Sequence, residues 1–578
     1  MTEPPPDARR ATRVGLLLGL VVAVVQLVPV LGRGYVLTRD MVFVPHQPLT
    51  GQLLGRDGVP RAVPSDLLVA LLSRVAPGWA VQDAILLAVI ALGAWGAARL
   101  LVSVSPAVSP WAPAVAAVAY GWNPYVSERL LLGQWAVLVG YAALPWVARA
   151  ALDVRRAVPG AWQRLVLALA AGACGGASAQ VLTAIVVLPL VLWGGPVTRA
   201  VRRGLGAVAA LGVLALPWLV PALLQPHGVP ADGTGVTVFS ARADTPLGTL
   251  ASLLSLGGAW DADVVPPGRD TVFLGVLAFV VAAGALITCV RHRSTRALGI
   301  TGVIALALAA AGTIPGLRDG MRAIVEHVAG GGLLRDGQRQ LAPLALAEAV
   351  GLALLAQEIA RQLAPARRTA TAVAAVVPIA VLPSAAWAVS GRLQAVTWPS
   401  DWKLVAAATK ALPSGPVLVL PWSTYRAFAW NGERTQLDPT SRWLDRRVIA
   451  SDDLVVGTTA VRGEDALAQR FAPVATATTS LSDALRGSGV VGVLVETGTP
   501  GGPDELDRTQ GLTAISTTPT LTLFAVPDAG TLRIDRVSAV AITMGDAVTV
   551  VAVLLAAFAG CAHAIRTRHP RNDHNNAV

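Results

Sequence analysis

Twelve apolar runs divide this 578-residue chain, and they constrain its fold more than any other feature of the sequence. A helix that crosses a bilayer needs about 20 mostly apolar residues, because an unpaired backbone amide in hydrocarbon costs several kcal/mol. The runs therefore predict a mainly α membrane protein with about twelve transmembrane helices. Two runs, joined only by Ala177 and Ser178, fit either two spans or one re-entrant hairpin. The predicted spans are 14–31, 80–101, 107–122, 134–150, 163–176, 179–194, 205–225, 271–290, 297–315, 339–360, 369–389 and 541–564.

The composition supports a membrane protein and argues against a nucleic-acid-binding one. Only 14% of the residues are charged, against about 25% in a typical soluble domain. The net charge of +11 invites a nucleic-acid partner, but the basic residues lie between the apolar runs and form no single patch. The three cysteines show no spacing typical of a disulfide framework or a zinc site. The sequence therefore predicts no nucleic-acid partner and no metal site, and it leaves a divalent cation open as a cofactor.

Arginine is denser in one set of connecting segments than in the other. If the N-terminus is cytoplasmic, the inner segments hold 20 arginines in 77 residues, and the short outer loops hold 12 in 133. This bias follows the positive-inside rule. No small-x-small cleavage site follows residue 31, so we expect the first span to be a retained anchor. The pattern predicts a multi-pass protein of the cell membrane with both termini cytoplasmic.

The chain divides into three predicted parts. Residues 1–390 form a polytopic transmembrane domain of about eleven spans, and residues 537–578 form the last transmembrane helix and a cytoplasmic tail. Between them, 391–536 is hydrophilic and long enough to bury its own core. Apolar runs at 416–421, 490–495 and 521–526 predict buried strands among helical stretches. We expect 391–536 to be an extracytoplasmic α/β domain.

Asp40 is the candidate catalytic residue, since it lies about nine residues past the first span, at the outer surface. A partly desolvated carboxylate there suits a general base. In the alternative interpretation, Asp40 pairs with Arg39 or caps the turn before Met41. His46, six residues on, is a second polar candidate in the same loop.

The other candidates are binding residues near the outer ends of spans. Arg129, Arg335 and Arg339 emerge there, and a guanidinium at headgroup level suits a lipid phosphate through bidentate hydrogen bonds. The alternative is snorkelling or ion pairing with the adjacent acids, Glu128 and Asp336. Glu348 lies deep in the tenth span. An intramembrane carboxylate indicates a polar cavity or proton coupling in a transporter.

Three outer segments and the topology resemble a known superfamily. The segments are NPYVSERLLLGQW (123–135), RADTPLGTLASLLSLGG (242–258) and LLRDGQRQ (333–340). Together with a long first outer loop that carries an acid, they resemble the GT-C superfamily of polytopic glycosyltransferases, in particular actinobacterial arabinofuranosyltransferases and mannosyltransferases of the cell envelope. The resemblance implies that Asp40 is the catalytic base and that the outer arginines hold the donor phosphate. Many members have paired acids in the first loop, whereas Asp40 follows Arg39.

The resemblance leads to one functional hypothesis with two alternatives. We expect a membrane glycosyltransferase that moves a sugar from a polyprenyl-phosphate donor to a cell-envelope glycan or lipid acceptor on the outer face. The first alternative is a transporter or flippase of a lipid-linked precursor, with Glu348 in its path. The second is a non-catalytic envelope-assembly scaffold whose partners bind the 391–536 segment.

Overall fold

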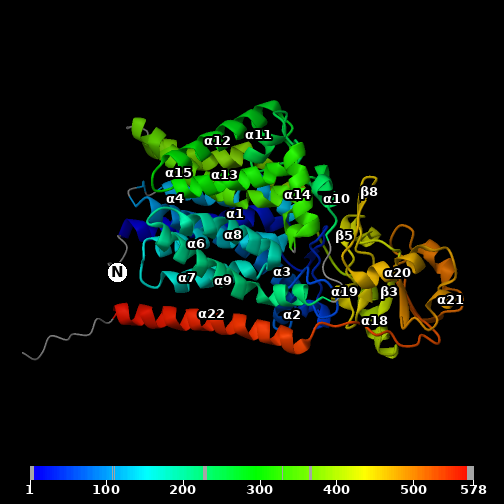
Figure 1. Ribbon diagram of the computed structural model, residues 1–578. Coiled ribbons are helices and arrows are strands. Elements are labelled where there is room, and N and C mark those ends of the chain that lie inside the picture. The colour runs from blue at the N-terminus through cyan, green and yellow to red at the C-terminus, as the bar shows by residue number, and fades with distance from the viewer. Residues whose placement is uncertain are drawn as a thin grey trace, which may run out of the picture.

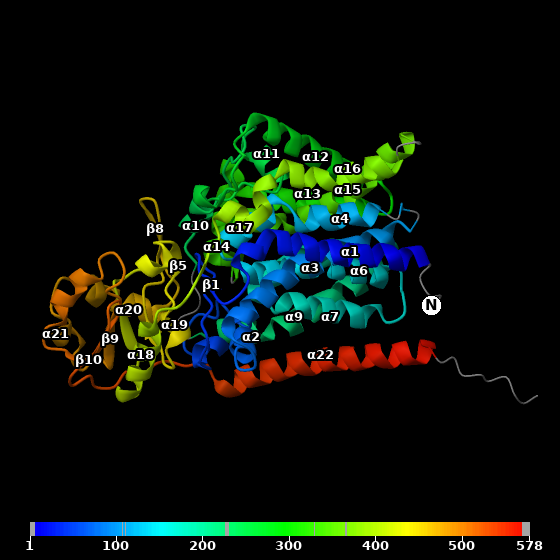
Figure 2. The same ribbon diagram turned by 180° about the vertical axis from the view of Figure 1, so that it is seen from behind.

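The computed structural model describes residues 6–106, 108–109, 111–225, 231–328, 330–363 and 367–568. Long helices pack side by side into a bundle, and a region of strands and short helices lies at one end of it (Figure 1). Figure 2 shows the same arrangement from behind, with the start of the chain at the opposite end of the bundle. The predicted tail at 569–578 lies outside the described residues.

Helices make up most of the described chain. In chain order they are α1 (Pro6–Leu27), α2 (Ser65–Leu72), α3 (Gly78–Val104), α4 (Ala112–Gly121), α5 (Pro124–Leu131), α6 (Trp135–Arg155), α7 (Ala161–Ala173), α8 (Gly176–Leu192), α9 (Val197–Leu223), α10 (Thr234–Val238), α11 (Thr249–Leu254), α12 (Val272–Arg291), α13 (Arg296–Ala311), α14 (Pro315–His327), α15 (Ala342–Gln362), α16 (Arg367–Val381), α17 (Ala386–Gly391), α18 (Ser400–Ala408), α19 (Thr440–Trp443), α20 (Ala466–Thr476), α21 (Leu481–Leu485) and α22 (Ala539–Arg568).

The chain is a multi-pass membrane protein, but the predicted number of twelve spans is not confirmed. Within the described ranges, seven helices are long and apolar enough to cross a bilayer, and two bent helix pairs raise the number to nine. The pairs α13–α14 and α16–α17 bend by 88° and 76°, where prolines interrupt the apolar runs at 315 and 383. The helices α4, α7 and α8 are too short by the same measure, because turns cut their runs.

The short helices α7 and α8 form a hairpin against α6. Its turn is made by Gly175 and Gly176, and a Cβ added to Gly175 would lie 2.1 Å from the carbonyl oxygen of Ala136. Only glycine therefore lets the turn pack this closely on the start of α6. This contact fixes the hairpin tip, Ala177 and Ser178, beside the segment that precedes α6.

In the part of the chain that the structure describes, strands occur in the first loop and in the region after α17. They are β1 (Tyr35–Val36), β2 (Ala395–Val396), β3 (Val417–Leu420), β4 (Tyr425–Ala427), β5 (Thr435–Leu437), β6 (Val448–Ile449), β7 (Leu454–Val456), β8 (Thr459–Val461), β9 (Gly492–Val495), β10 (Thr513–Thr517) and β11 (Thr522–Ala525).

A five-stranded mixed sheet forms the centre of this region, in the order β10-β11-β9-β3-β6. The strand β3 runs parallel to β6 and β9, while β11 is antiparallel to both of its neighbours. Alternate residues of β3 enter different cores: Val417 and Val419 pack with α18, and Leu418 and Leu420 pack with α20 and α21. Burial on both faces explains why the sequence of β3 is continuously apolar. The three predicted strand runs match β3, β9 and β11.

A buried charged cluster follows β9 in the sheet region. Arg426 lies between two carboxylates: it donates to Glu496 and, over 2.8 Å, to Asp438. Thr440 also donates to Glu496, over 3.1 Å. Burial raises the pKa of Glu496 to about 7, and the neighbouring Asp438 acts in the same direction, while Arg426 opposes the rise. The guanidinium group of Arg426 therefore pairs with two buried carboxylates, and Glu496 takes up or releases its proton near pH 7.

This cluster predicts a pH dependence of stability. The pKa of Glu496 is about 7 in the folded chain and about 4.3 in an unfolded one, so the folded state binds the proton more tightly. The resulting stability is present at low pH and is lost as the pH rises through 7. We expect the free energy of unfolding to fall by about 3 kcal/mol from pH 5 to pH 8. Tryptophan fluorescence can monitor the unfolding.

Glu496→Gln should flatten the pH dependence of stability, and Glu433→Gln, at an exposed position, should leave that dependence intact. An unchanged slope in Glu496→Gln would contradict the assignment.

Candidate active site

The first loop carries Asp40 into the junction between the bundle and the sheet region. The strand β1 pairs antiparallel with β2, and the chain then turns back on itself through a bridge between Thr38 and Met41. Arg39 takes a left-handed backbone conformation with φ of 42° in this turn. Its amide donates to the carbonyl of Thr435 over 2.7 Å, and the amide of Leu437 donates to its carbonyl over 2.7 Å. Backbone pairing to the sheet region thus fixes the position of Asp40.

The carboxylate of Asp40 is half-buried and accepts hydrogen bonds from neutral groups. The Tyr425 hydroxyl donates to its Oδ1 over 2.7 Å, and the Gln134 amide donates to its Oδ2 over 3.5 Å. Arg39 instead pairs with Asp261 at 2.7 Å. The alternative in which Arg39 neutralises Asp40 is therefore wrong. Burial and the negative charge of Asp40 raise the pKa of Tyr425 well above its usual value, so this phenol stays protonated as a donor.

A cavity of about 330 Å³ opens beside Asp40. Six segments that are far apart in the sequence contribute to its walls: the first loop, the start of α6, the tip of the α7–α8 hairpin, the segment between α10 and α12, the segment before α15 and the sheet region. The charged and polar lining residues are Asp40, Arg61, Ser65, Asp66, Gln134, Ser178, Arg335, Asp336, Arg339, Thr424, Tyr425, Arg442, Asp452 and Arg462. The cavity brings together Asp40, Arg335, Asp336 and Arg339, all candidates from the sequence.

Two arginines from the segment before α15 have donor capacity left in this cavity. Arg335 donates to Glu464 over 3.1 Å and lies over the ring of Phe239. Arg339 donates to the Ser178 hydroxyl over 2.9 Å and pairs with Asp336 at 3.3 Å, while its buried Nε has no hydrogen-bond partner among the described residues. An anion in the cavity can therefore accept hydrogen bonds from both guanidinium groups.

Arg129 lies behind the cavity wall. Its side chain is 0% exposed and donates to Asp336 over 2.8 Å, so it does not line the cavity as predicted for a phosphate ligand. Burial alone would raise the pKa of Asp336, but Arg129 and Arg339 outweigh it and hold the pKa below its ordinary value. Arg129 thus keeps Asp336 ionised, and Asp336 in turn orients Arg339.

Three other candidates also lie away from Asp40. Glu128 is fully buried and accepts from Gln338 over 2.8 Å; burial, with Asp244 nearby, raises its pKa well above the usual range. His46 is exposed and does not line the cavity. Glu348 lines a separate cavity of about 70 Å³ among α4, α12, α15 and α16. The structure therefore does not bring these three residues into the Asp40 cavity.

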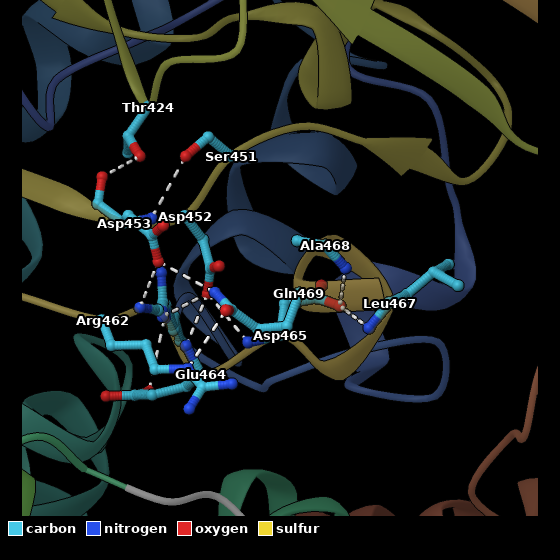
Figure 3. Close-up of polar contacts among 12 residues, drawn as sticks. Thr424, Ser451, Asp452, Asp453, Arg462, Glu464, Asp465, Leu467, Ala468 and Gln469 are labelled. Carbon is cyan, nitrogen blue, oxygen red and sulfur yellow. Dashed lines mark hydrogen bonds and ion pairs between the residues drawn. The ribbon is translucent and has the colours of Figure 1, made fainter. Parts of the chain in front are cut away.

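The far wall of the cavity comes from the sheet region and was missed by sequence reasoning. Figure 3 shows Asp452 and Asp453 turned toward the segment that leads into α20. Asp452 accepts from the amides of Glu464 and Asp465 over 2.7 and 2.8 Å, and it also pairs with Arg61 at 2.9 Å. These bonds all go to Oδ2 of Asp452 and hold two loops together, while its buried Oδ1 has no hydrogen-bond partner among the described residues. The sequence offered one signal, the adjacent acids 452 and 453, but nothing that placed them near Asp40.

Within the described part of the chain, no group of three or more His, Cys, Asp or Glu side chains could hold a metal ion. The groups gathered at the cavity around Asp40 are its two neutral donors, Tyr425 and Gln134, and the guanidinium groups of Arg335 and Arg339.

Comparison with solved structures identifies proteins that resemble this chain in fold. The arabinofuranosyltransferase AftD from Mycobacteria aligns with 91% of this chain at a TM-score of 0.59 and 16% identity. The chain therefore shares its fold with part of AftD. A mutant of AftD gives the same TM-score, and the match covers 42% of its length, so the chain spans about two fifths of AftD. ArnT from Cupriavidus metallidurans aligns with a TM-score of 0.43 and 13% identity. No family model and no curated protein matches the sequence.

Proposed function

We propose that this GT-C chain is a membrane glycosyltransferase that uses the Asp40 cavity to transfer a sugar from a polyprenyl-phosphate donor to a cell-envelope glycan or lipid acceptor. The observation that carries the proposal is the placement of a half-buried carboxylate, which has no cationic partner among the described residues, in the same cavity as Arg335 and Arg339. The likeness of the fold to AftD, a glycosyltransferase by name, supports the reaction class.

The proposed reaction is a single displacement that inverts the anomeric carbon. Asp40 takes the proton of the acceptor hydroxyl while that oxygen bonds to the anomeric carbon. The bond between this carbon and the phosphate oxygen breaks, and the polyprenyl phosphate leaves with the electron pair. Arg335 and Arg339 stabilise the negative charge that grows on the departing phosphate. Because phosphate is already a good leaving group, one carboxylate is sufficient.

Tyr425 and Gln134 would hold the base rather than react. Both donate to Asp40, and they fix its carboxylate toward the cavity. Such orientation lowers the activation barrier of the transfer, because the base is already held in the position from which it reacts. The sheet region therefore completes the site, since it supplies Tyr425 and the far wall.

The direct test is transfer of radiolabelled sugar by the purified chain in lipid nanodiscs. A panel of polyprenyl-phosphate sugars should include a donor from which label passes to an envelope glycan or lipid extract, in proportion to the amount of protein. If no donor of the panel gives transfer above a protein-free control, the proposed function is wrong.

The topology belongs to the same proposal. We place the chain in the cell membrane with both termini cytoplasmic, and we place residues 391–536 on the outer side with the Asp40 cavity. A membrane-impermeant thiol reagent should then label a cysteine introduced at the exposed position Leu404 in intact cells. It should not label one introduced at exposed Arg293. The reverse labelling would overturn this orientation.

Tyr425→Phe tests how the base is held. The change removes the hydroxyl that donates to Asp40 and keeps the ring, so we expect kcat to fall about tenfold, as for loss of a hydrogen bond to a charged group, with KM nearly constant. Steady-state transfer assays measure both constants. The control is Tyr35→Phe, buried outside the cavity, which should match the wild type. Equal kcat in Tyr425→Phe and wild type would show that this contact does not position the base.

A further inference from the structure

A second, larger cavity lies between α3, α6 and α7. It has a volume of about 580 Å³ and shares no lining residue with the Asp40 cavity. Its walls are mostly aliphatic, with Ile85 and Ala88 from α3, Ala143 from α6 and Ala168 from α7 among them. On α3 the lining residues recur every three to four positions, which places them on one face of the helix. The cavity is therefore an apolar groove along the bundle.

One end of this groove is cationic. Arg99, Arg149 and Arg164 line it together with a single acid, Asp153, which pairs with Arg164 at 3.2 Å. Among the described residues Arg149 makes no hydrogen bond and no ion pair within 4.0 Å, and the opposite charge that acts on it is that of Asp153, which already pairs with Arg164. Three guanidinium groups thus face one carboxylate, and the excess of positive charge has no partner in the described chain.

Aromatic rings hold Arg99 in place at this end. Its guanidinium carbon lies 5.2 Å from the ring centroid of Trp95 and 5.4 Å from that of Trp146. Its Nε is buried and has no hydrogen-bond partner among the described residues. The two rings keep the guanidinium from swinging away, so a donor remains fixed and unused beside the groove.

The groove is long enough to hold the acyl chains of one bilayer leaflet. Arg99 lies 21 residues after Gly78, the first residue of α3, which is about 32 Å along the helix. The cationic end is therefore at the opposite end of α3 from the Asp40 cavity. From Ile85 to Arg99 the groove runs for about 21 Å, enough to take the acyl chains of one leaflet of a hydrocarbon core about 30 Å thick.

We infer that the groove binds an anionic phospholipid of the leaflet opposite the Asp40 cavity. Its phosphate accepts hydrogen bonds from Arg99 and Arg149, and an acyl chain lies along the aliphatic wall. The charge excess selects an anionic headgroup. The orientation separates this lipid from the proposed sugar donor, whose phosphate must lie at the Asp40 end. A bound lipid would link α3, α6 and α7 where the protein leaves a gap.

The test is lipid retention by the full chain, measured by native mass spectrometry after purification from nanodiscs of phosphatidylcholine and phosphatidylglycerol. We expect one phosphatidylglycerol per chain to remain bound. The double variant Arg99→Gln/Arg149→Gln, which removes both proposed phosphate ligands and keeps the Arg164–Asp153 pair, should lower its retention at least fivefold. The matched control, Arg291→Gln/Arg293→Gln, changes two arginines near the end of α12 that do not line the groove, and it should retain the lipid as the wild type does.

A second variant keeps every charge and fills the apolar wall. Ala88→Phe/Ala168→Phe should lower phosphatidylglycerol retention to the same extent, and it separates a lipid from a soluble anion. Equal retention of phosphatidylcholine and phosphatidylglycerol, displacement by inorganic phosphate, or preferential retention of a polyprenyl phosphate added to the nanodiscs as a competitor would each overturn the inference. Because no sugar donor is present, the result does not depend on whether the proposed transferase activity is found.

Discussion

Asp40→Asn is expected to lower sugar transfer by about 10²- to 10⁴-fold, the range that general-base catalysis supplies. An amide has nearly the shape of the carboxylate and can still accept from Tyr425, so the cavity should keep its form. It cannot take the proton of the acceptor hydroxyl. The loss should therefore appear in kcat, with little change in KM or in the melting temperature of the purified chain.

The control for this variant is a carboxylate in the segment between α11 and α12 that has no part in the cavity. Asp263 is 87% exposed at its side chain and does not line the cavity. Asp263→Asn should transfer sugar at the wild-type rate. An Asp40→Asn chain that keeps more than a tenth of the wild-type kcat would remove Asp40 from the role of base, even if the chain proves to be a transferase.

Arg129→Met is expected to have the largest effect on stability. The side chain of Arg129 is 0% exposed and that of Asp336 is 4% exposed, so removing the cation leaves a buried carboxylate whose remaining ion pair among the described residues is with Arg339. Breaking a buried pair in this way typically costs about 3 to 5 kcal/mol. We expect a lower yield of folded protein and a lower melting temperature in detergent.

Two further variants separate lost charge pairing from lost packing. Adding Asp336→Asn to Arg129→Met removes the uncompensated charge and should restore part of the stability. Arg486→Met breaks an exposed pair, with side chains 59% and 83% exposed, and should change stability by less than about 1 kcal/mol. If the double variant is no more stable than Arg129→Met alone, the buried ion pair is not the cause.

The sequence predicted the secondary structure of each segment better than it predicted which segments lie next to one another in the fold. The apolar runs predicted a mainly helical membrane protein, which is confirmed, and the runs at 416–421 and 490–495 match β3 and β9. The number of twelve spans is not confirmed, because residue counts in an apolar run cannot show where a proline or a glycine turn bends it. The run 297–315 contains one helix and the first residue of another, which meet at 88°.

The candidate site shows the same difference between what the sequence predicted and what the packing of the helices decided. The sequence nominated three outer arginines on equal terms, yet Arg335 and Arg339 line the cavity and Arg129 lies behind it. Which way an arginine points near the end of a span depends on the helices that pack against it. Glu348 was nominated because an intramembrane carboxylate is costly, but the packing of α15 turns it toward a different cavity.

The sequence by itself determined that this chain lies in a membrane as helices and carries a separate segment able to form a sheet. Hydrocarbon leaves backbone amides no other partner, and a strand buried on both faces must be apolar throughout. Only the tertiary structure decided that Asp40 meets Tyr425, a residue 385 positions away. That contact depends on the pairing of the first loop with the sheet region, where backbone hydrogen bonds at Arg39 fix the register. Local preferences carry no information about such pairing, because it arises when distant surfaces pack together.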